Sequence, residues 1–291
     1  MKPFDFVQPA TTDAAIAALA EHSPNVRILA GGTDYVVELK FVTESPGVVV
    51  DVSRLEDLKG IELTDAGLRI GAGVTHTEIM EHPLIAEHAS AMIDAAHTVG
   101  AVQTRNLGTL GGNLVTCVPS MDSGPTLMAL DAQVTILGPN GTRSMDLVEF
   151  FVGVRKTALQ PDELLLEIII PKENLGKPAG FIKFGLRKGQ ALALVNAASS
   201  FTIEDGKFKD VRISLGAVAP VVIRATKAEA VLEGQAVSEE LINEAAKVSV
   251  TEANPIDDFR ASKEYRNDLI EVGTRRTLQA ALDIANSRAN G

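Results

Sequence analysis

Leu29-Ala-Gly-Gly-Thr-Asp34 and Arg105-Asn-Leu-Gly-Thr-Leu-Gly-Gly-Asn113 are two glycine-rich turns in which adjacent glycines stand beside small hydroxyl or amide side chains. Glycine has no Cβ, so the backbone can take positive φ values and can approach a bulky anion closely. Successive N–H groups in such turns form a concave anion-binding surface. The pair of turns therefore predicts a site for the two phosphates of a dinucleotide.

Two other phosphate-binding patterns do not fit these turns. The spacing Gly108-x-x-Gly111-Gly112 differs from the glycine fingerprint of a Rossmann site, and neither turn ends in the Gly-Lys-Ser/Thr of a nucleoside triphosphatase loop. A Gly-Gly pair between apolar segments is also common in ordinary tight turns. The interpretation as a cofactor site therefore depends on the rest of the chain as well.

The composition is that of a soluble protein with a substantial core. The chain has 291 residues, 45% of them hydrophobic, which predicts two or three folded units. A net charge of −11 argues against nonspecific nucleic-acid binding, which needs a basic surface. No stretch reaches the roughly 20 apolar residues that span a bilayer. The first residues carry no apolar signal core, so we expect a cytoplasmic protein.

The cysteine and histidine residues predict neither a metal site nor a catalytic nucleophile. Cys117 is the single cysteine, so an internal disulfide and a cysteine-held iron–sulfur cluster are both excluded, and we expect a small buried side chain. The histidines lack zinc-site spacing and are expected to be ordinary surface or capping residues: His22, His76, His82, His88 and His97. No Gly-x-Ser-x-Gly elbow is present.

Short strands and helices alternate over the first part of the chain. Thr75-His-Thr-Glu78 is a capping box that begins a helix. The run 164–170 is apolar apart from Glu167 and ends at Pro171, as expected of a buried strand. Further helices are predicted at 13–20, 85–99 and 125–130, and further strands at 26–30, 48–52, 68–72 and 133–137, the last followed by a turn at 139–141.

The order of elements changes after residue 178. The polar segment 171–178 contains two prolines and a glycine and is the best candidate for a linker. Strands are predicted at 180–186, 193–203 and 208–218, with a hairpin turn at Glu204-Asp-Gly206. From residue 225 the pattern is helical, in three segments of which the last runs from about 262 to 289. Strands followed by helices predict a separate α+β unit.

Several short motifs stand in a fixed order along the chain. They are Phe4-Asp-Phe-Val-Gln-Pro9, the two glycine turns with Pro119, Asp122 and Pro125 after the second, Thr157-Ala-Leu-Gln-Pro-Asp-Glu163, Ile168-Ile-Ile-Pro171, Gly216-Ala-Val-Ala-Pro220 with Arg224, and Asp258-Phe-Arg-Ala-Ser262 with Tyr265-Arg266. With these motifs the chain resembles, nearly from end to end, the FAD-binding medium subunits of the molybdenum hydroxylases, the group that includes xanthine dehydrogenase and carbon monoxide dehydrogenase. One departure is Val154, where many members of that family have an aromatic residue before the arginine.

The resemblance implies an α+β fold in two parts. Residues 1–175 would form an FAD-binding domain of the vanillyl-alcohol-oxidase-like (PCMH) type, with subdomains of about 1–55 and 56–175. Residues 176–291 would form the C-terminal domain of the medium subunit, a small antiparallel sheet with helices.

The resemblance also assigns FAD-binding roles to individual positions. Asp122 would accept hydrogen bonds from hydroxyls of the cofactor, although aspartate before Pro125 is also typical of a helix cap. Leu165 would pack on the isoalloxazine ring and Lys183 would approach the polar edge of that ring, but both also suit an ordinary strand. The full set is Ile28, Leu29, Ala30, Gly31, Gly32, Thr33, Asp34, Tyr35, Val99, Thr109, Gly111, Gly112, Asn113, Asp122, Leu165 and Lys183.

The function implied by the resemblance is electron transfer. A molybdopterin-containing large subunit would oxidise the substrate, and a small subunit with [2Fe–2S] clusters would pass the electrons to noncovalently bound FAD on this chain. The flavin would then reduce an acceptor such as NAD⁺, a ferredoxin, a quinone or oxygen. No residue of this chain is expected to act as a catalytic acid or base.

Two other functional classes stay open at this point. A self-contained flavin reductase, similar to the enolpyruvyl reductases of cell-wall synthesis, would need substrate-binding groups in the C-terminal part, and Gly216-Ala-Val-Ala-Pro220 argues against it. A non-catalytic assembly subunit would need a degenerate flavin site, which the intact glycines do not suggest.

Overall fold

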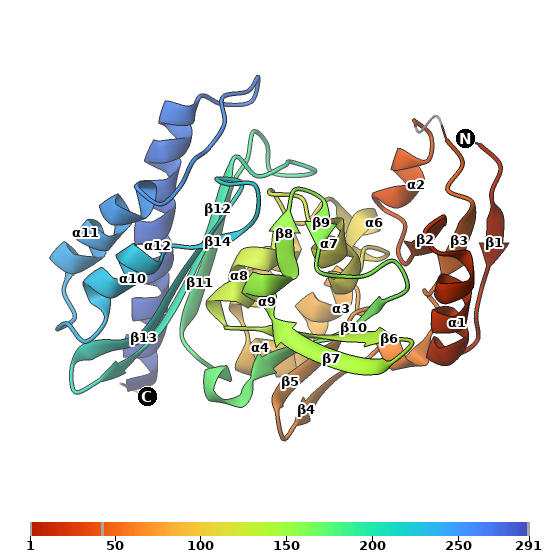
Figure 1. The fold of residues 1–291 in the computed structure, drawn as a ribbon. Helices are drawn as coiled ribbons and strands as arrows, with labels where there is room; N and C mark the ends of the chain where they lie inside the picture. Colours follow the sequence, from red (N-terminus) through yellow and green to blue (C-terminus); the bar gives the residue numbers. More distant parts are fainter. Residues whose placement is uncertain (1, 42–43, 290–291) are drawn as a thin grey trace.

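The fold is described from a computed structural model, in which residues 2–41 and 44–289 are placed. Within these residues the chain forms four sheets and the helices that cover them (Figure 1). The N-terminal sheet lies at one end of the molecule and the last three helices lie at the other (Figure 1). This α+β arrangement confirms the predicted fold class.

The first sheet is parallel, with its strands in the order β1-β3-β2. The elements of this part are β1 (Asp5–Val7), α1 (Thr12–His22), β2 (Val26–Leu29), α2 (Tyr35–Glu38) and β3 (Val48–Asp51). The Thr11 hydroxyl accepts a hydrogen bond from the Ala14 N–H and caps α1, as the sequence predicts. Strand β2 ends directly before the first glycine turn, so the sheet fixes where that turn begins.

The second sheet is antiparallel and its strands lie in the order β4-β5-β10-β6-β7. These strands are β4 (Ile61–Thr64), β5 (Gly67–Gly71), β6 (Gln133–Gly138), β7 (Gly141–Asp146) and β10 (Leu164–Pro171). The apolar run of β10 lies at the centre, paired with β5 on one side and β6 on the other. Its prediction as a buried strand is confirmed, and so is the turn between β6 and β7.

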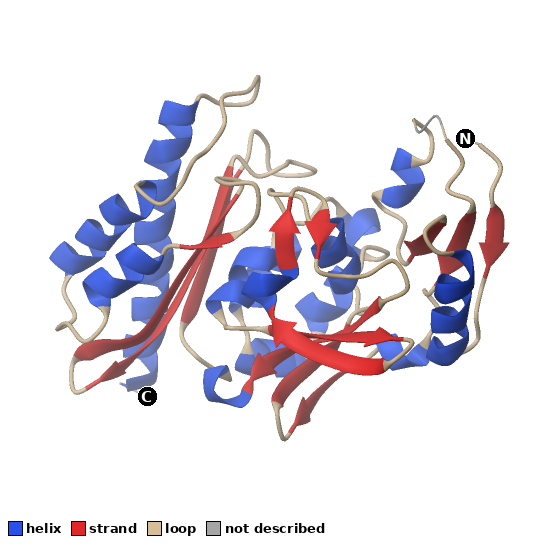
Figure 2. Ribbon diagram, viewed as in Figure 1, coloured by secondary structure: helices blue, strands red, loops and turns tan. Residues whose placement is uncertain are grey.

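Short helices and a small hairpin surround the second sheet (Figure 2). The predicted capping box is present, because Thr75 Oγ1 accepts from the Glu78 N–H at 3.2 Å and the Thr75 N–H donates to the Glu78 carboxylate at 2.7 Å. The elements are η1 (Glu56–Leu58), α3 (His76–Glu81), α4 (Pro83–His88), α5 (Ala91–Thr98), α6 (Val102–Arg105), α7 (Leu110–Thr116), α8 (Ser123–Ala129), α9 (Leu147–Phe150), β8 (Phe151–Gly153), β9 (Lys156–Thr157) and η2 (Lys172–Asn174).

The prediction of one continuous helix over residues 85–99 is wrong. The structure has two helices there, α4 and α5, because Ala89 leaves the helical region at φ −150° and ψ 46°. The break frees the His88 carbonyl, which accepts a hydrogen bond of 2.7 Å from the Gly176 N–H. The neighbouring serine, Ser90, is a residue type that favours helix boundaries over helix interiors. The hydrogen bond from Gly176, which is distant in sequence, thus takes the place of a hydrogen bond within a helix.

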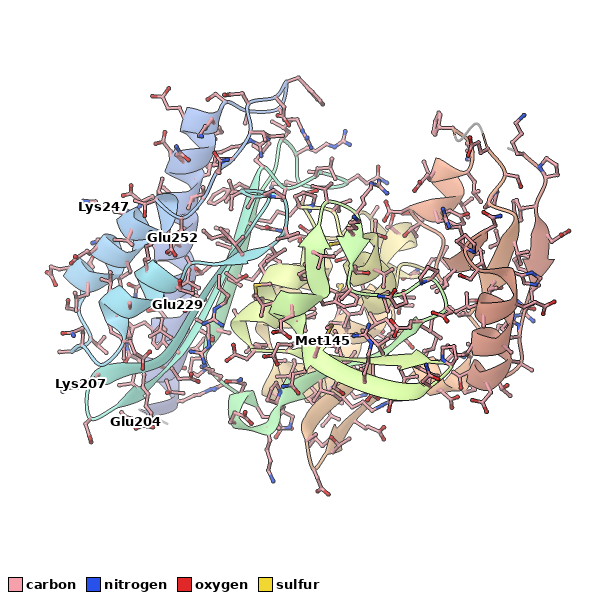
Figure 3. All side chains as sticks on the ribbon, viewed as in Figure 1. Met145, Glu204, Lys207, Glu229, Lys247 and Glu252 are labelled. Carbon is pink, nitrogen blue, oxygen red and sulfur yellow. The ribbon has the colours of Figure 1, made fainter. Side chains whose placement is uncertain are left out.

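The C-terminal part is an antiparallel sheet with three helices, as predicted. The strands pair in the order β11-β12-β13-β14, and Glu204 and Lys207 flank the hairpin turn at one end of the sheet (Figure 3). Helix α12 packs on β11 and β12 from one face, whereas α8 contacts the other face. The elements are β11 (Ala179–Phe184), β12 (Val195–Glu204), β13 (Lys207–Gly216), β14 (Ile223–Arg224), α10 (Thr226–Leu232), α11 (Glu239–Val250) and α12 (Lys263–Ala289).

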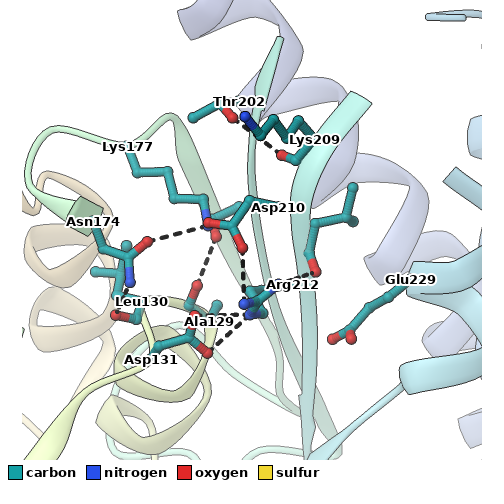
Figure 4. A network of polar contacts seen from close by, with 12 residues as sticks. Ala129, Leu130, Asp131, Asn174, Lys177, Thr202, Lys209, Asp210, Arg212 and Glu229 are labelled. Carbon is teal, nitrogen blue, oxygen red and sulfur yellow. Dashed lines mark hydrogen bonds and ion pairs between the residues drawn. The ribbon is translucent and has the colours of Figure 1, made fainter. Parts of the chain in front are cut away.

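The segment 171–178, predicted as a linker, is packed between the two parts. The Asn174 amide donates to the Leu130 carbonyl at 3.1 Å, and the buried Lys177 ammonium donates to the Asp210 carboxylate at 2.7 Å (Figure 4). Arg212 on β13 binds Asp131, at the end of α8, at 2.8 Å (Figure 4). Several polar and ionic contacts thus hold the C-terminal sheet against the N-terminal part.

Candidate functional site

A cavity of about 440 Å³ lies where the two glycine turns meet the second sheet. The first turn follows β2 of the first sheet, and the second turn precedes α7, which contacts β10. Both turns contribute to its wall, together with the ends of β3, β5 and β10. The residues that the sequence predicts as cofactor contacts and that line this cavity are Ile28, Ala30, Gly31, Gly32, Thr33, Asp34, Tyr35, Val99, Thr109, Gly111, Gly112, Asn113 and Leu165.

The two turns touch each other backbone to backbone. A Cβ added to Gly31 would lie 1.7 Å from the Leu107 carbonyl oxygen and 2.5 Å from its carbonyl carbon. Because two backbone segments cannot yield as a flexible side chain can, only glycine fits at position 31. This contact joins segments that are far apart in the sequence into a single wall of the cavity.

The first turn supplies open hydrogen-bond donors. Gly32 has φ +70°, a value that glycine adopts without strain, and its carbonyl accepts from the Val36 N–H at 3.0 Å. Within the described residues, the N–H groups of positions 31–34 donate to no protein acceptor. Consecutive N–H groups without partners, at the wall of a cavity, are suited to binding an anion.

The second turn differs from the sequence interpretation, because its glycines do not offer free N–H groups. Gly111 donates to the Ala72 carbonyl at 2.8 Å, and Gly112 donates to the Thr109 hydroxyl at 3.0 Å. Both lie in helix α7, outside the positive-φ region. A Cβ on Gly111 would lie 2.6 Å from the Ala72 Cβ. These glycines allow α7 to pack closely on the end of β5, and the expectation of positive φ at them is wrong.

Side chains around the second turn still point to polar contacts with a ligand. Thr109 is the N-cap of α7, and its hydroxyl keeps a proton to donate while it accepts from Gly112. The Asn113 side-chain oxygen, Oδ1, accepts from the Ser123 hydroxyl at 2.5 Å. No described residue accepts from the side-chain nitrogen, Nδ2, of Asn113. Thr109 and Asn113 therefore offer donors at the cavity wall.

His76 is a cavity residue that the sequence did not identify. It was expected to be a surface or capping residue, but its side chain is 2% exposed and lines the cavity. Burial, together with the nearby Arg105 guanidinium, lowers the pKa of His76 to about 4, so the ring is neutral at neutral pH. The sequence does contain one signal for the burial of His76. The residue directly follows the predicted N-cap Thr75, shortly after the strand β5 ends.

Tyr35 and His76 each carry a buried polar atom without a hydrogen-bond partner among the described residues, the Tyr35 hydroxyl and His76 Nδ1. The Tyr35 side chain belongs to the cavity lining, and its hydroxyl is enclosed. Burial raises the pKa of Tyr35, while the Arg27 charge opposes that effect. Buried polar atoms without partners are uncommon in native proteins, so both side chains indicate that this wall is completed by something other than the chain.

Leu29, Asp122 and Lys183 lie outside the cavity lining. The Lys183 ammonium donates to the Asp122 carboxylate at 2.5 Å and to the Thr98 carbonyl at 3.1 Å. Both side chains are nearly enclosed, at 7% and 8% exposure. Burial raises the pKa of Asp122 to about 6, against the effects of Lys183 and Asn196. Although Asp122 stands at the N-cap of α8, its side chain makes no capping bond. The pair thus joins β11 to the start of α8.

The prediction that Cys117 is a small buried side chain is confirmed. Cys117 is 1% exposed, and its thiol donates to the carbonyls of Gly153 and Lys156 at 3.4 Å. Burial raises the pKa of this thiol, which keeps it in the unreactive form. The described residues contain no cluster of three histidine, cysteine, aspartate or glutamate side chains that could hold a metal ion. None of the helices over the described ranges is long and apolar enough to span a membrane.

Comparisons with known proteins place the cavity in a family context. Residues 2–173 match the family described as the FAD-binding domain in molybdopterin dehydrogenase, and residues 181–281 match the CO dehydrogenase flavoprotein C-terminal domain. The chain is 30% identical over 292 residues to the xanthine dehydrogenase FAD-binding subunit of Escherichia coli O157:H7, covering 98% of this chain and 99% of that protein.

A second curated relative and a solved structure show similarity over the same extent of the chain. A subunit of the 6-hydroxypseudooxynicotine dehydrogenase complex of Paenarthrobacter nicotinovorans is 32% identical, over 97% of this chain and 96% of that one. The structure superposes on a chain of carbon monoxide dehydrogenase from Hydrogenophaga pseudoflava with a TM-score of 0.93 at 28% identity, covering 98% and 99% of the two chains. The similarity therefore spans the whole fold.

Proposed function

The chain belongs to the family of FAD-binding subunits of the molybdopterin dehydrogenases, and on that premise we propose that it is the electron-transfer subunit of a molybdenum hydroxylase complex. It would take electrons from [2Fe–2S] clusters of a partner subunit and pass them, through FAD, to an acceptor such as NAD⁺. Bound FAD supplies both one-electron and two-electron redox states, which suits a position between clusters and a hydride acceptor.

One observation supports the proposal that this cavity binds a dinucleotide. The first turn presents consecutive N–H groups without protein acceptors, and the second turn packs against it so closely that a Cβ at Gly31 has no room. The donors belong to the backbone, so their positions are fixed by the sheet rather than by flexible side chains. A diphosphate supplies several negatively charged oxygens that can accept from such N–H groups.

The chain's own residues would divide the work along the cofactor. The turn at 31–34 would bind the diphosphate, and Thr109 and Asn113 would donate from the opposite wall. Leu165 and Val99 are buried apolar residues of the same lining and would pack against ring surfaces. Asp122 and Lys183 would act beside the cavity, next to the Thr98 carbonyl, and Leu29 would support the turn from β2. These roles, like the division at residue 175, are proposals.

The partners are inferred from the named relatives. One of them is a subunit of a dehydrogenase complex, and several others are named as subunits or medium chains. The described residues contain no group of three histidine, cysteine, aspartate or glutamate side chains placed to hold a metal ion, and the chain has one cysteine. The molybdopterin and [2Fe–2S] centres would therefore reside on a large and a small partner subunit. We propose that the complex acts in the cytoplasm and that NAD⁺ is the first acceptor to test.

Release of the cofactor tests whether FAD is bound noncovalently. Cys117 is enclosed, and none of the histidines stands in an attachment motif, so no covalent bond to the flavin is expected. Acid or heat precipitation of the purified chain should leave a yellow supernatant with the mass of FAD. Colour retained in the precipitate, release of FMN, or a colourless purified protein would each contradict the proposal; the last result is the one expected of an assembly subunit without a cofactor.

A further inference from the structure

The His76 imidazole is a buried polar group of the cavity lining, and its Nδ1 has no hydrogen-bond partner among the described residues. It stands at the first position of α3, where its backbone N–H donates to the Gly108 carbonyl at 3.1 Å. Neither ring nitrogen has a hydrogen-bond partner in the described part of the chain. A buried N–H without an acceptor destabilises a folded protein, so the single proton of the neutral ring belongs on the nitrogen that a ligand can reach.

The two ring nitrogens differ in their surroundings. Nδ1 is fully enclosed, whereas Nε2 is not, and the side chain lines the cavity. The Cδ2 atom, which is bonded to Nε2, lies 3.6 Å from the position that a Cβ on Gly108 would take, and Thr33 Oγ1 lies 3.3 Å from that same position. The Nε2 edge of the ring therefore lies at the junction of the two glycine turns, beside the first turn's hydroxyl.

We propose that His76 Nε2–H donates a hydrogen bond to a phosphate oxygen of the dinucleotide, at the junction of the two turns. This inference rests on the proposed function, since it names a further residue of the same site. A phosphate offers acceptors only, so a neutral imidazole that binds it must carry its proton on Nε2. The enclosed Nδ1 then keeps a lone pair and needs no acceptor.

The neighbours of His76 favour an anion over an uncharged ligand group. The N–H groups of positions 31–34 and the Thr33 hydroxyl are donors on the same side of the cavity. The Arg105 guanidinium is close enough to lower the pKa of His76, and its Nη1 donates to the carbonyls of His97 and Val99. A group that accepts several hydrogen bonds and carries negative charge matches this set.

Affinity measurements on three variants test the proposal. Apoprotein is titrated with FAD, and the dissociation constant is read from flavin fluorescence. His76→Leu should weaken binding about 10- to 100-fold, the effect of losing a hydrogen bond to a charged group. His76→Gln, whose amide nitrogen can reach the place of Nε2, should retain most of the affinity. His97→Gln, a change in an exposed histidine of α5, should leave the affinity unchanged.

Nitrogen NMR of the wild-type protein provides a readout that does not depend on a variant that folds. With histidine labelled in both nitrogens, His76 should show the neutral tautomer protonated on Nε2, and FAD should slow the exchange of that proton. Wild-type affinity in His76→Leu, or a proton on Nδ1, would overturn the role of His76 while leaving the flavin site intact. Failure of the wild-type apoprotein to bind FAD would instead overturn the proposed function.

Discussion

Gly31→Ala is expected to abolish the retention of FAD. The new Cβ would lie 1.7 Å from the Leu107 carbonyl oxygen, far inside contact distance, so the two glycine turns would have to move apart. Forcing extra atoms into a packed contact costs about 1–3 kcal/mol, and here the displaced atoms are the cavity wall itself. The measurement is the flavin absorbance of the purified variant relative to its protein absorbance, together with its thermal midpoint.

Gly153→Ala is the matched control for this change. It adds the same methyl group at a position where the nearest atom, the Lys156 Cβ, would be 3.7 Å away, an ordinary contact distance. Gly153 lies outside the cavity lining, so its flavin content and thermal midpoint should equal those of the wild type. Full flavin occupancy in Gly31→Ala would show that the meeting of the two turns does not shape the cofactor site.

Lys183→Met is expected to destabilise the protein by about 3–5 kcal/mol at pH 8, the usual cost of leaving one member of a buried ion pair without its partner. The Asp122 carboxylate is 8% exposed and would keep only uncharged polar neighbours, the side chains of Asn196 and Thr98. Chemical denaturation of the wild type and the variant at several pH values measures the difference in the free energy of unfolding.

The pH dependence follows from the direction of the pKa shift. Burial raises the pKa of Asp122 to about 6 from its ordinary value of 3.8, and loss of Lys183 would raise it further. A carboxyl whose pKa is higher in the folded state favours folding when protonated. The defect of Lys183→Met should therefore be small below pH 4 and should grow as the pH rises through 6.

A double variant and an exposed pair control this result. Asp122→Asn combined with Lys183→Met removes both charges and should recover most of the lost stability at pH 8. Lys209 and Glu204 form an ion pair with the same distance of 2.5 Å, but both side chains are more than half exposed, so Lys209→Met should leave the thermal midpoint unchanged. A Lys183→Met protein as stable as the wild type at pH 8 would mean that this pair is not desolvated.

The elements that the sequence predicts well are those fixed by local chemistry. The capping box at Thr75 requires only residues three positions apart, and the hairpin at Glu204-Asp-Gly206 requires only a turn between alternating strands. The central strand β10 is visible as an apolar run because both its edges and its faces are covered. The resemblance to a known family extended these local predictions to the whole fold.

The features that the sequence did not predict depend on contacts between distant segments. The break between α4 and α5 is stabilised by Gly176, and the burial of the segment 171–178 depends on Leu130 and Asp210. The sequence predicts that the glycines of α7 bind phosphate through their N–H groups. In the structure these N–H groups donate to the Ala72 carbonyl and the Thr109 hydroxyl instead. The burial of His76 likewise results from the packing of α3 against the second turn, which one sequence does not reveal.

Electron transfer into the flavin is the measurement that tests the central claim most directly. The FAD-loaded chain is mixed, without oxygen, with the pre-reduced [2Fe–2S] subunit that we expect to copurify with it from its native cells, and the oxidised-flavin absorption band is followed. We expect the band to bleach as the clusters reoxidise, and we expect NAD⁺ to restore it if NAD⁺ is the acceptor. Persistence of the oxidised band beside reduced clusters, or complete turnover of a substrate by the isolated chain without molybdenum or iron, would contradict the account.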